Sequence, residues 1–87
     1  MMKLPDVYDN AVIGIGEQHG MQTCIVYDAD KVIQTLVRVE GMHADEAREY
    51  AEFNIFTAYV GDGTPIFVYR MGMEEIEEMI GTDEVSD

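Results

Sequence analysis

The sequence predicts an α+β fold: one small domain over residues 1–81 in the element order ββααβα, followed by a flexible acidic tail at 82–87. Three observations predict it. Short β-prone runs are bounded by glycine turns, longer segments repeat apolar residues at helical spacing, and 87 residues leave room for one core. We expect a three-stranded, mainly antiparallel sheet with the helices packed on one face. The long helical excursion before the third strand leaves the strand order open.

The first two strands are predicted to form a hairpin. An apolar run covers residues 11–16, and a second β-prone run covers 22–27. The segment 17–20 between them contains glycine, which favours a hairpin turn. The third strand, 66–70, begins directly after Pro65, where the missing backbone N–H costs least.

Three helices are predicted from apolar spacing. In the segment 29–40, apolar residues share one helical face, Asp28 and Asp30 are N-cap candidates and Gly41 is placed to end the helix. Its β-branched residues also permit a strand. The segment 44–58 has the clearest helical period, and a short helix follows at 72–80.

Two of these helices carry specific expectations about their buried sides. Four side chains of the helix 72–80 are expected to face inward: Met73, Ile76, Met79 and Ile80. Asn54 lies on the apolar side of the preceding helix, and a buried Asn needs hydrogen-bond partners. We therefore expect Asn54 to bond the backbone of the turn at 59–65, a structural role, and to hold the fold together with Tyr50 and Phe53.

The charge balance limits the classes of partner. Eighteen acidic residues against five basic ones give a formal net charge of −13. Direct binding to nucleic acid or to an anionic membrane is disfavoured because both are polyanions. A basic protein or a cation remains as a partner, and the acidity can also serve solubility alone.

The carboxylates gather on two surfaces. One is the outer face of the helix 44–58: Asp45, Glu46, Glu49 and Glu52. The other is the end of the chain: Glu74, Glu75, Glu77 and Glu78, then Asp83, Glu84 and Asp87. A helix rises about 1.5 Å per residue, close to the spacing of about 1.7 Å per charge along B-DNA. Clustered carboxylates on a short helix can therefore occupy a basic nucleic-acid-binding groove, and a purely solvated surface is the alternative.

Two segments resemble ligand loops and fail the test of context. Gly14, Gly16 and Gly20 suggest a dinucleotide-binding loop, but the third glycine is one residue late and a strand follows where a helix is needed. Asp28 and Asp30 could begin a calcium loop, but the later Gly and Glu are missing. We expect no cofactor.

The residue types that carry out catalysis lack a recognisable arrangement. His19 falls in a turn and His43 at a helix start, and neither has a ligand-spaced Cys or His nearby. Cys24 lies in an apolar run, where a buried, inert thiol is expected. The sequence therefore predicts a binding protein and not an enzyme, without a metal site.

The chain is expected to be cytoplasmic. Its single cysteine fits a reducing compartment. No stretch approaches the length of a membrane span, and the first residues lack the apolar core of a signal peptide.

The apolar content predicts a homodimer surface. Eight aromatic residues and seven methionines exceed what a monomer of this size is expected to bury. Phe56, Tyr59 and Tyr69 are the aromatic residues expected at that surface.

Residues 9–68 resemble a group of small uncharacterised proteins that are encoded mostly by phages and prophages. The likeness rests on the segments 26–28, 41–54, 58–61 and 64–67. The group has Ser where this chain has His43, which would form a capping box with the Glu three residues later. The resemblance implies a phage-borne accessory protein and names no substrate.

Two functions are compatible with these observations. The first is an accessory protein that binds and blocks a basic, nucleic-acid-binding host protein, such as a defence nuclease. The alternative is an oligomer that sequesters a small signalling ligand or nucleotide. In that case the turns 14–20 and 61–64 would place backbone amides near the ligand, and an anionic ligand would need Lys31, Arg38 or Arg48 nearby.

Overall fold

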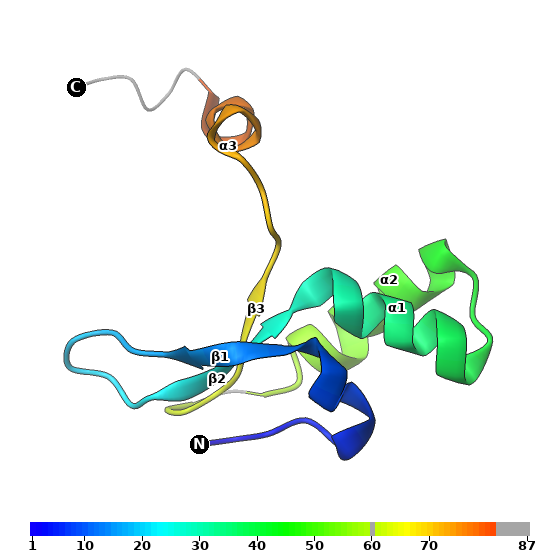
Figure 1. Ribbon diagram of the computed structural model, residues 1–87, viewed down its shortest axis with the longest axis horizontal. Coiled ribbons are helices and arrows are strands. Elements are labelled where there is room, and N and C mark those ends of the chain that lie inside the picture. The colour runs from blue at the N-terminus through cyan, green and yellow to red at the C-terminus, as the bar shows by residue number, and fades with distance from the viewer. Residues whose placement is uncertain (60, 82–87) are drawn as a thin grey trace.

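The computed structural model describes residues 1–59 and 61–81 and confirms the α+β fold (Figure 1). The predicted tail at 82–87 lies outside these residues. The elements in chain order are a 3₁₀ helix, Asp6–Ala11 (η1), β1 (Val12–Gly16), β2 (Cys24–Asp28), α1 (Ala29–Glu40), α2 (Ala44–Ala51), a π-helical turn, Glu52–Phe56 (η2), β3 (Ile66–Val68) and α3 (Met73–Ile80).

The sheet is mixed, with β2 at its centre in the order β1-β2-β3. β1 and β2 form the predicted antiparallel hairpin, whereas β3 pairs with β2 in parallel. The expectation of a mainly antiparallel sheet is therefore wrong for the second pair of strands. A parallel neighbour needs a long crossover, and the excursion through α1, α2 and η2 supplies it.

The hydrophobic core lies on one face of the sheet. Tyr27 of β2 is fully buried, and its ring stacks on Phe67 of β3 with centroids 5.9 Å apart. Phe56 of η2 also packs on Phe67, with ring centroids 4.4 Å apart. The remaining core residues come from the N-terminal segment and the helices: Leu4, Ala11, Val32, Ile33, Leu36, Ala47, Ala51 and Ile55.

The helix α1 begins and ends where the sequence predicts. The Asp28 carboxylate accepts a hydrogen bond from the backbone N–H of Lys31 at 3.1 Å, which is the N-cap arrangement. Gly41 ends the helix in the left-handed region, with φ of 72°. Each signal acts within about one turn of its own end of the helix. The helix therefore forms despite its β-branched residues.

The expected buried position of Asn54 is wrong. The predicted helix 44–58 is regular only over α2 and continues as the wider turn of η2. A π-helical turn shifts the phase of the side chains that follow, so Ile55 takes the buried position and Phe53 is 71% exposed. The exposed side chain of Asn54 donates to the carbonyl of Tyr50 within its own helix, at 3.2 Å, and to none of the described residues of the later turn.

The predicted packing of α3 is also wrong. None of its residues is buried, and all four side chains expected to face inward are exposed. Figure 1 shows why: residues 69–72 run as an extended segment that carries α3 away from the other elements. The radius of gyration is 14.8 Å, against about 12 Å for a compact domain of this length.

The aromatic residues expected at a homodimer surface have different environments. Phe56 and Tyr59 are half-buried and pack against the core of their own chain. Tyr69 remains 40% exposed, with its ring edge against Phe56. Burial of the Tyr69 ring raises the pKa of its hydroxyl.

Removing the hydroxyl of Tyr27 tests how much its buried hydrogen bond stabilises the core. The hydroxyl accepts a buried hydrogen bond from the backbone N–H of Leu4 at 2.9 Å, which joins the N-terminal segment to β2. Tyr27→Phe leaves that N–H unpaired, at a cost of about 1–3 kcal/mol. We expect the melting temperature to fall by at least about 4 °C. Tyr50→Phe, at an exposed ring, is the control; equal melting temperatures for the two variants would contradict the assignment.

Candidate functional site

The acidic helix α3 is built by local signals. The Glu75 carboxylate accepts a hydrogen bond from the backbone N–H of Gly72 at 2.9 Å, which caps the first turn. Glu74 and Glu75 lie in that turn, where negative charge stabilises a helix through its dipole. The helix therefore forms although it buries none of its own residues.

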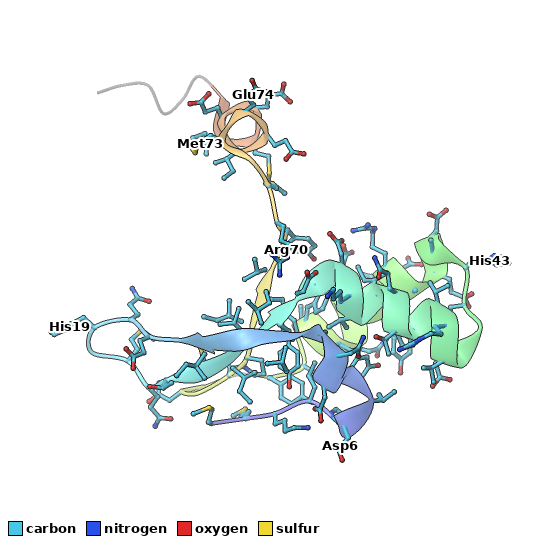
Figure 2. The ribbon with its side chains drawn as sticks, in the orientation of Figure 1. Asp6, His19, His43, Arg70, Met73 and Glu74 are labelled. Atoms are coloured by element: carbon cyan, nitrogen blue, oxygen red, sulfur yellow. The ribbon has the colours of Figure 1, made fainter. Side chains whose placement is uncertain are left out.

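The side chains of α3 divide into two sides. At about 100° per residue, the four predicted carboxylates share one side of the helix: Glu74, Glu75, Glu77 and Glu78. The other side is an apolar ridge made of Met73, Ile76, Met79 and Ile80. Met73 and Glu74 project from different sides of the helix in Figure 2. Both sides are exposed, so α3 presents its charges and its apolar ridge to solvent together.

The second predicted acidic surface lies on α2. Its four carboxylates are all exposed: Asp45, Glu46, Glu49 and Glu52. Glu46 also accepts a hydrogen bond from the backbone N–H of His43 at 3.4 Å. Figure 1 shows α2 and α3 well apart, so the structure does not join the two acidic surfaces into one.

An ion pair holds the segment from which α3 projects. Nε of Arg70 donates to Oδ2 of Asp28 at 2.8 Å. Asp28 is 4% exposed, and the hydrogen bond from Arg70 holds the pKa of its carboxyl below the usual range, against the effect of burial. Sequence reasoning identified Asp28 as a helix cap and rejected it as the start of a calcium loop, but did not identify it as an ion-pair partner. The sequence contains one signal for this ion pair, which was missed: Arg70 is the last basic residue of the chain and follows the third strand.

A cavity of about 340 Å³ opens between the two glycine turns that the sequence analysis singled out. It is lined by Gly16–Gln18, Met21, Gln22, Cys24, Gly61–Thr64 and Ile66. Gly63 has φ of 78°, a backbone conformation that residues with a Cβ rarely adopt, so this wall favours glycine. Two carboxylates and no Lys or Arg appear among the lining residues of the described chain, which favours a neutral or cationic ligand.

The histidines do not form a site together. His19, in the hairpin turn, and His43, at the start of α2, lie at opposite ends of the molecule in Figure 2. Within residues 1–59 and 61–81, no three His, Cys, Asp or Glu side chains are grouped to hold a metal ion. In the same part of the chain, no helix has the length and apolar character needed to cross a membrane.

Comparison with protein-family models gave no match, and neither did comparison with curated proteins or with solved structures.

The ion pair between Asp28 and Arg70 predicts a pH-dependent contribution to stability. The pKa of Asp28 is lower in the folded chain, so the contribution is present above about pH 4 and is lost as the pH falls through the depressed pKa. Asp28→Asn keeps a capping oxygen but loses the charge. Because Arg70 is largely exposed, we expect a cost of about 1 kcal/mol at neutral pH.

Thermal melts of the parent and of Asp28→Asn between about pH 7 and pH 3 measure this effect. The difference in melting temperature should shrink as the solution is acidified. In an Arg70→Met background the substitution should cost less, as a double-mutant cycle requires. A difference that is constant with pH would contradict the role of the ion pair.

Proposed function

We propose that this protein is a cytoplasmic accessory protein, without enzymatic activity, that binds a basic host protein through α3 and blocks its nucleic-acid-binding surface. The observation that carries the proposal is the position of α3. It projects from the domain with four carboxylates on one side. No contact within the described part of the chain buries these carboxylates. A helix held in this way can enter a groove that the body of the domain cannot reach.

The charge density of α3 supports this mode of binding. Four carboxylates fall within five consecutive residues, Glu74–Glu78. At about 1.5 Å of rise per residue, this is roughly one negative charge per 2 Å, close to the value for B-DNA. Lys and Arg side chains that contact phosphates along a groove would therefore meet carboxylates at similar intervals.

The phage resemblance of residues 9–68 supports a bacterial host protein as the partner, such as a defence nuclease. Electrostatic attraction between a chain of charge −13 and a basic surface accelerates association and falls with salt. The apolar ridge beside the carboxylates does not contribute to this salt dependence.

Neutralising α3 tests the proposal. Glu→Gln at positions 74, 75, 77 and 78 removes four charges and preserves helix propensity and the capping interaction. The parent, used as bait in a bacterial lysate, is expected to retain a basic nucleic-acid-binding protein. With that protein purified, the α3 variant should bind at least about tenfold more weakly and should no longer compete with a DNA duplex.

The matched control neutralises the four carboxylates of α2, so both variants have the same net charge. Its binding is expected to stay within about threefold of the parent, and raised salt should weaken both. Equal losses in the two variants would show a general charge effect and contradict a role specific to α3. Binding that is insensitive to salt and to both substitutions would exclude electrostatic mimicry.

The cavity favours a second candidate function, the binding of a small molecule. The absence of Lys and Arg among its described lining residues favours a neutral or cationic compound over the nucleotide considered above. Its walls are largely apolar, and its polar side chains come from five lining residues: Glu17, Gln18, Gln22, Asp62 and Thr64. Sequestration of such a ligand needs no catalytic residue.

Thermal shift measurements test this candidate. A neutral or amine ligand should raise the melting temperature in proportion to the logarithm of its concentration above Kd, and nucleotides should not. Met21→Trp fills the cavity from an exposed position, 60% accessible in the parent, and should abolish the response. An equal response from Met21→Trp would place the ligand elsewhere.

A further inference from the structure

We propose that the outer edge of β1 binds an extended segment of a basic protein, which adds a further strand to the sheet. The strand order β1-β2-β3 gives β1 a neighbour on one side only. In Figure 1 the hairpin of β1 and β2 extends away from α1 and α2, which lie at the opposite end of the molecule. This binding does not involve α3, so it can fail independently of the function proposed above.

The backbone of β1 has hydrogen-bonding groups on its outer side that no neighbouring strand pairs. In an antiparallel pair of strands, alternate residues direct their N–H and C=O groups away from the partner strand. Among residues 1–59 and 61–81, none of the backbone hydrogen bonds outside the helices and the sheet involves residues 13–16. An extended peptide beside β1 would pair these groups as a strand of the sheet does.

β1 lacks the side chains that usually protect an edge strand. Natural edge strands carry charged residues or Pro, which prevent pairing with other chains. β1 has neither, and its three aliphatic side chains are exposed: Val12 at 42%, Ile13 at 45% and Ile15 at 63%. The one protective feature is a bulge between Val12 and Gly14, and the pairing is regular from Gly14 to Gly16. The edge is therefore open on the side of the hairpin turn.

The two sides of β1 differ, and the difference specifies the side chains of the docked segment. Directly paired residues point to the same side of a sheet. The register with β2 therefore places Val12 and Ile15 on one side and Gly14 and Gly16 on the other. A docked strand also alternates its side chains. Aliphatic residues would contact Val12 and Ile15, and longer polar side chains would extend over the side on which β1 has only glycine.

Charge complementarity selects Lys or Arg for these polar positions. The cavity of about 340 Å³ described above reaches β1 at Gly16, and its lining includes the carboxylates of Glu17 and Asp62 and, among the described residues, no Lys or Arg. The whole hairpin, residues 12–28, contains no Lys or Arg. A strand docked on β1 lies about 4.8 Å from it. A Lys or Arg placed opposite Gly16 would then direct its charge toward the cavity, which provides specificity beyond the backbone contacts.

The same chemistry disfavours β1 of a second copy as the occupant. Two chains of net charge −13 repel each other. A second β1 would also bring Gly14 and Gly16 to the positions that face the cavity, where a cationic side chain is needed. The docked segment therefore belongs to a protein of opposite charge, with Lys or Arg alternating with aliphatic residues.

A synthetic peptide of this pattern, acetyl-Lys-Val-Lys-Val-Lys-Val-amide, is the probe for the full chain. At about 150 mM NaCl it is expected to bind with a Kd below about 1 mM. Amide hydrogen exchange followed by NMR locates the contact. At a peptide concentration of about ten times Kd, outward amides of residues 13–16 should exchange about tenfold more slowly, and amides of α3 should not change. Failure to bind, or protection confined to other residues, would overturn the proposal.

Matched peptides separate strand pairing from simple attraction of opposite charges. The same peptide with every amide N-methylated keeps its charge and loses its N–H donors, so it should bind at least about tenfold more weakly. A peptide with Thr in place of each Lys keeps the donors and loses the charge, and should bind β1 several-fold more weakly. Equal affinity of the N-methylated peptide would show electrostatic adsorption to the acidic chain and overturn the proposal.

Variants of the chain test each part of the contact. Ile15→Gln removes an exposed aliphatic side chain without changing the charge and should weaken binding at least about threefold. Val39→Gln, at a 50% exposed position of α1, is the matched control and should bind as the parent does. Glu17→Gln with Asp62→Asn should reduce the preference for the Lys peptide over the Thr peptide by at least about half. An unchanged preference would contradict the role of the cavity.

Two further measurements distinguish the other outcomes. The variant with Gln at positions 74, 75, 77 and 78 should still show protection of residues 13–16 by the peptide, because α3 takes no part. Loss of that protection would assign the peptide to α3 and overturn the β1 site. Sedimentation equilibrium without peptide should give the mass of one chain, 9.8 kDa. Twice that mass, with the amides of β1 already protected, would identify a second copy as the occupant and contradict the proposal.

Discussion

Tyr27 connects the parts of this domain that are most distant in the sequence. Its ring stacks on Phe67 of β3, and its hydroxyl holds the backbone of Leu4 near the N-terminus. The next residue, Asp28, caps α1 and pairs with Arg70. Two adjacent residues at the end of the central strand therefore determine where the N-terminal segment, the first helix and the arm of α3 lie. Both sides of α3 are exposed because this junction leaves the helix outside the core.

The structural features predicted most accurately from the sequence are those that depend on residues close together in the chain. α1 begins and ends at the expected residues because its signals, the Asp28 cap and the Gly41 turn, act within a few residues of the helix. The four carboxylates of α3 share one side for the same reason, since helical geometry alone brings them together. The strands were placed within about two residues, as their apolar runs and turns suggest.

The errors have a different origin. The outward position of Asn54 follows from a π-helical turn, which the apolar period of the sequence does not reveal. The exposure of the α3 ridge could not be predicted because an amphipathic helix has the same sequence pattern whether its partner is its own core or another molecule. The cavity needed the pairing of Val26 with Ile66, which brings together two glycine turns that lie far apart in the chain.

The parallel pairing of β2 with β3 also has a consequence for the order of folding. The hairpin and α1 join residues close in the chain, whereas β3 meets β2 only after a loop of about forty residues has closed, with a larger loss of chain entropy. During synthesis, the ring of Tyr27 therefore cannot stack on Phe67 until most of the chain has left the ribosome. An early intermediate without β3 would expose the side of the hairpin that carries Tyr27. The net negative charge of the chain would then keep nascent copies apart by electrostatic repulsion.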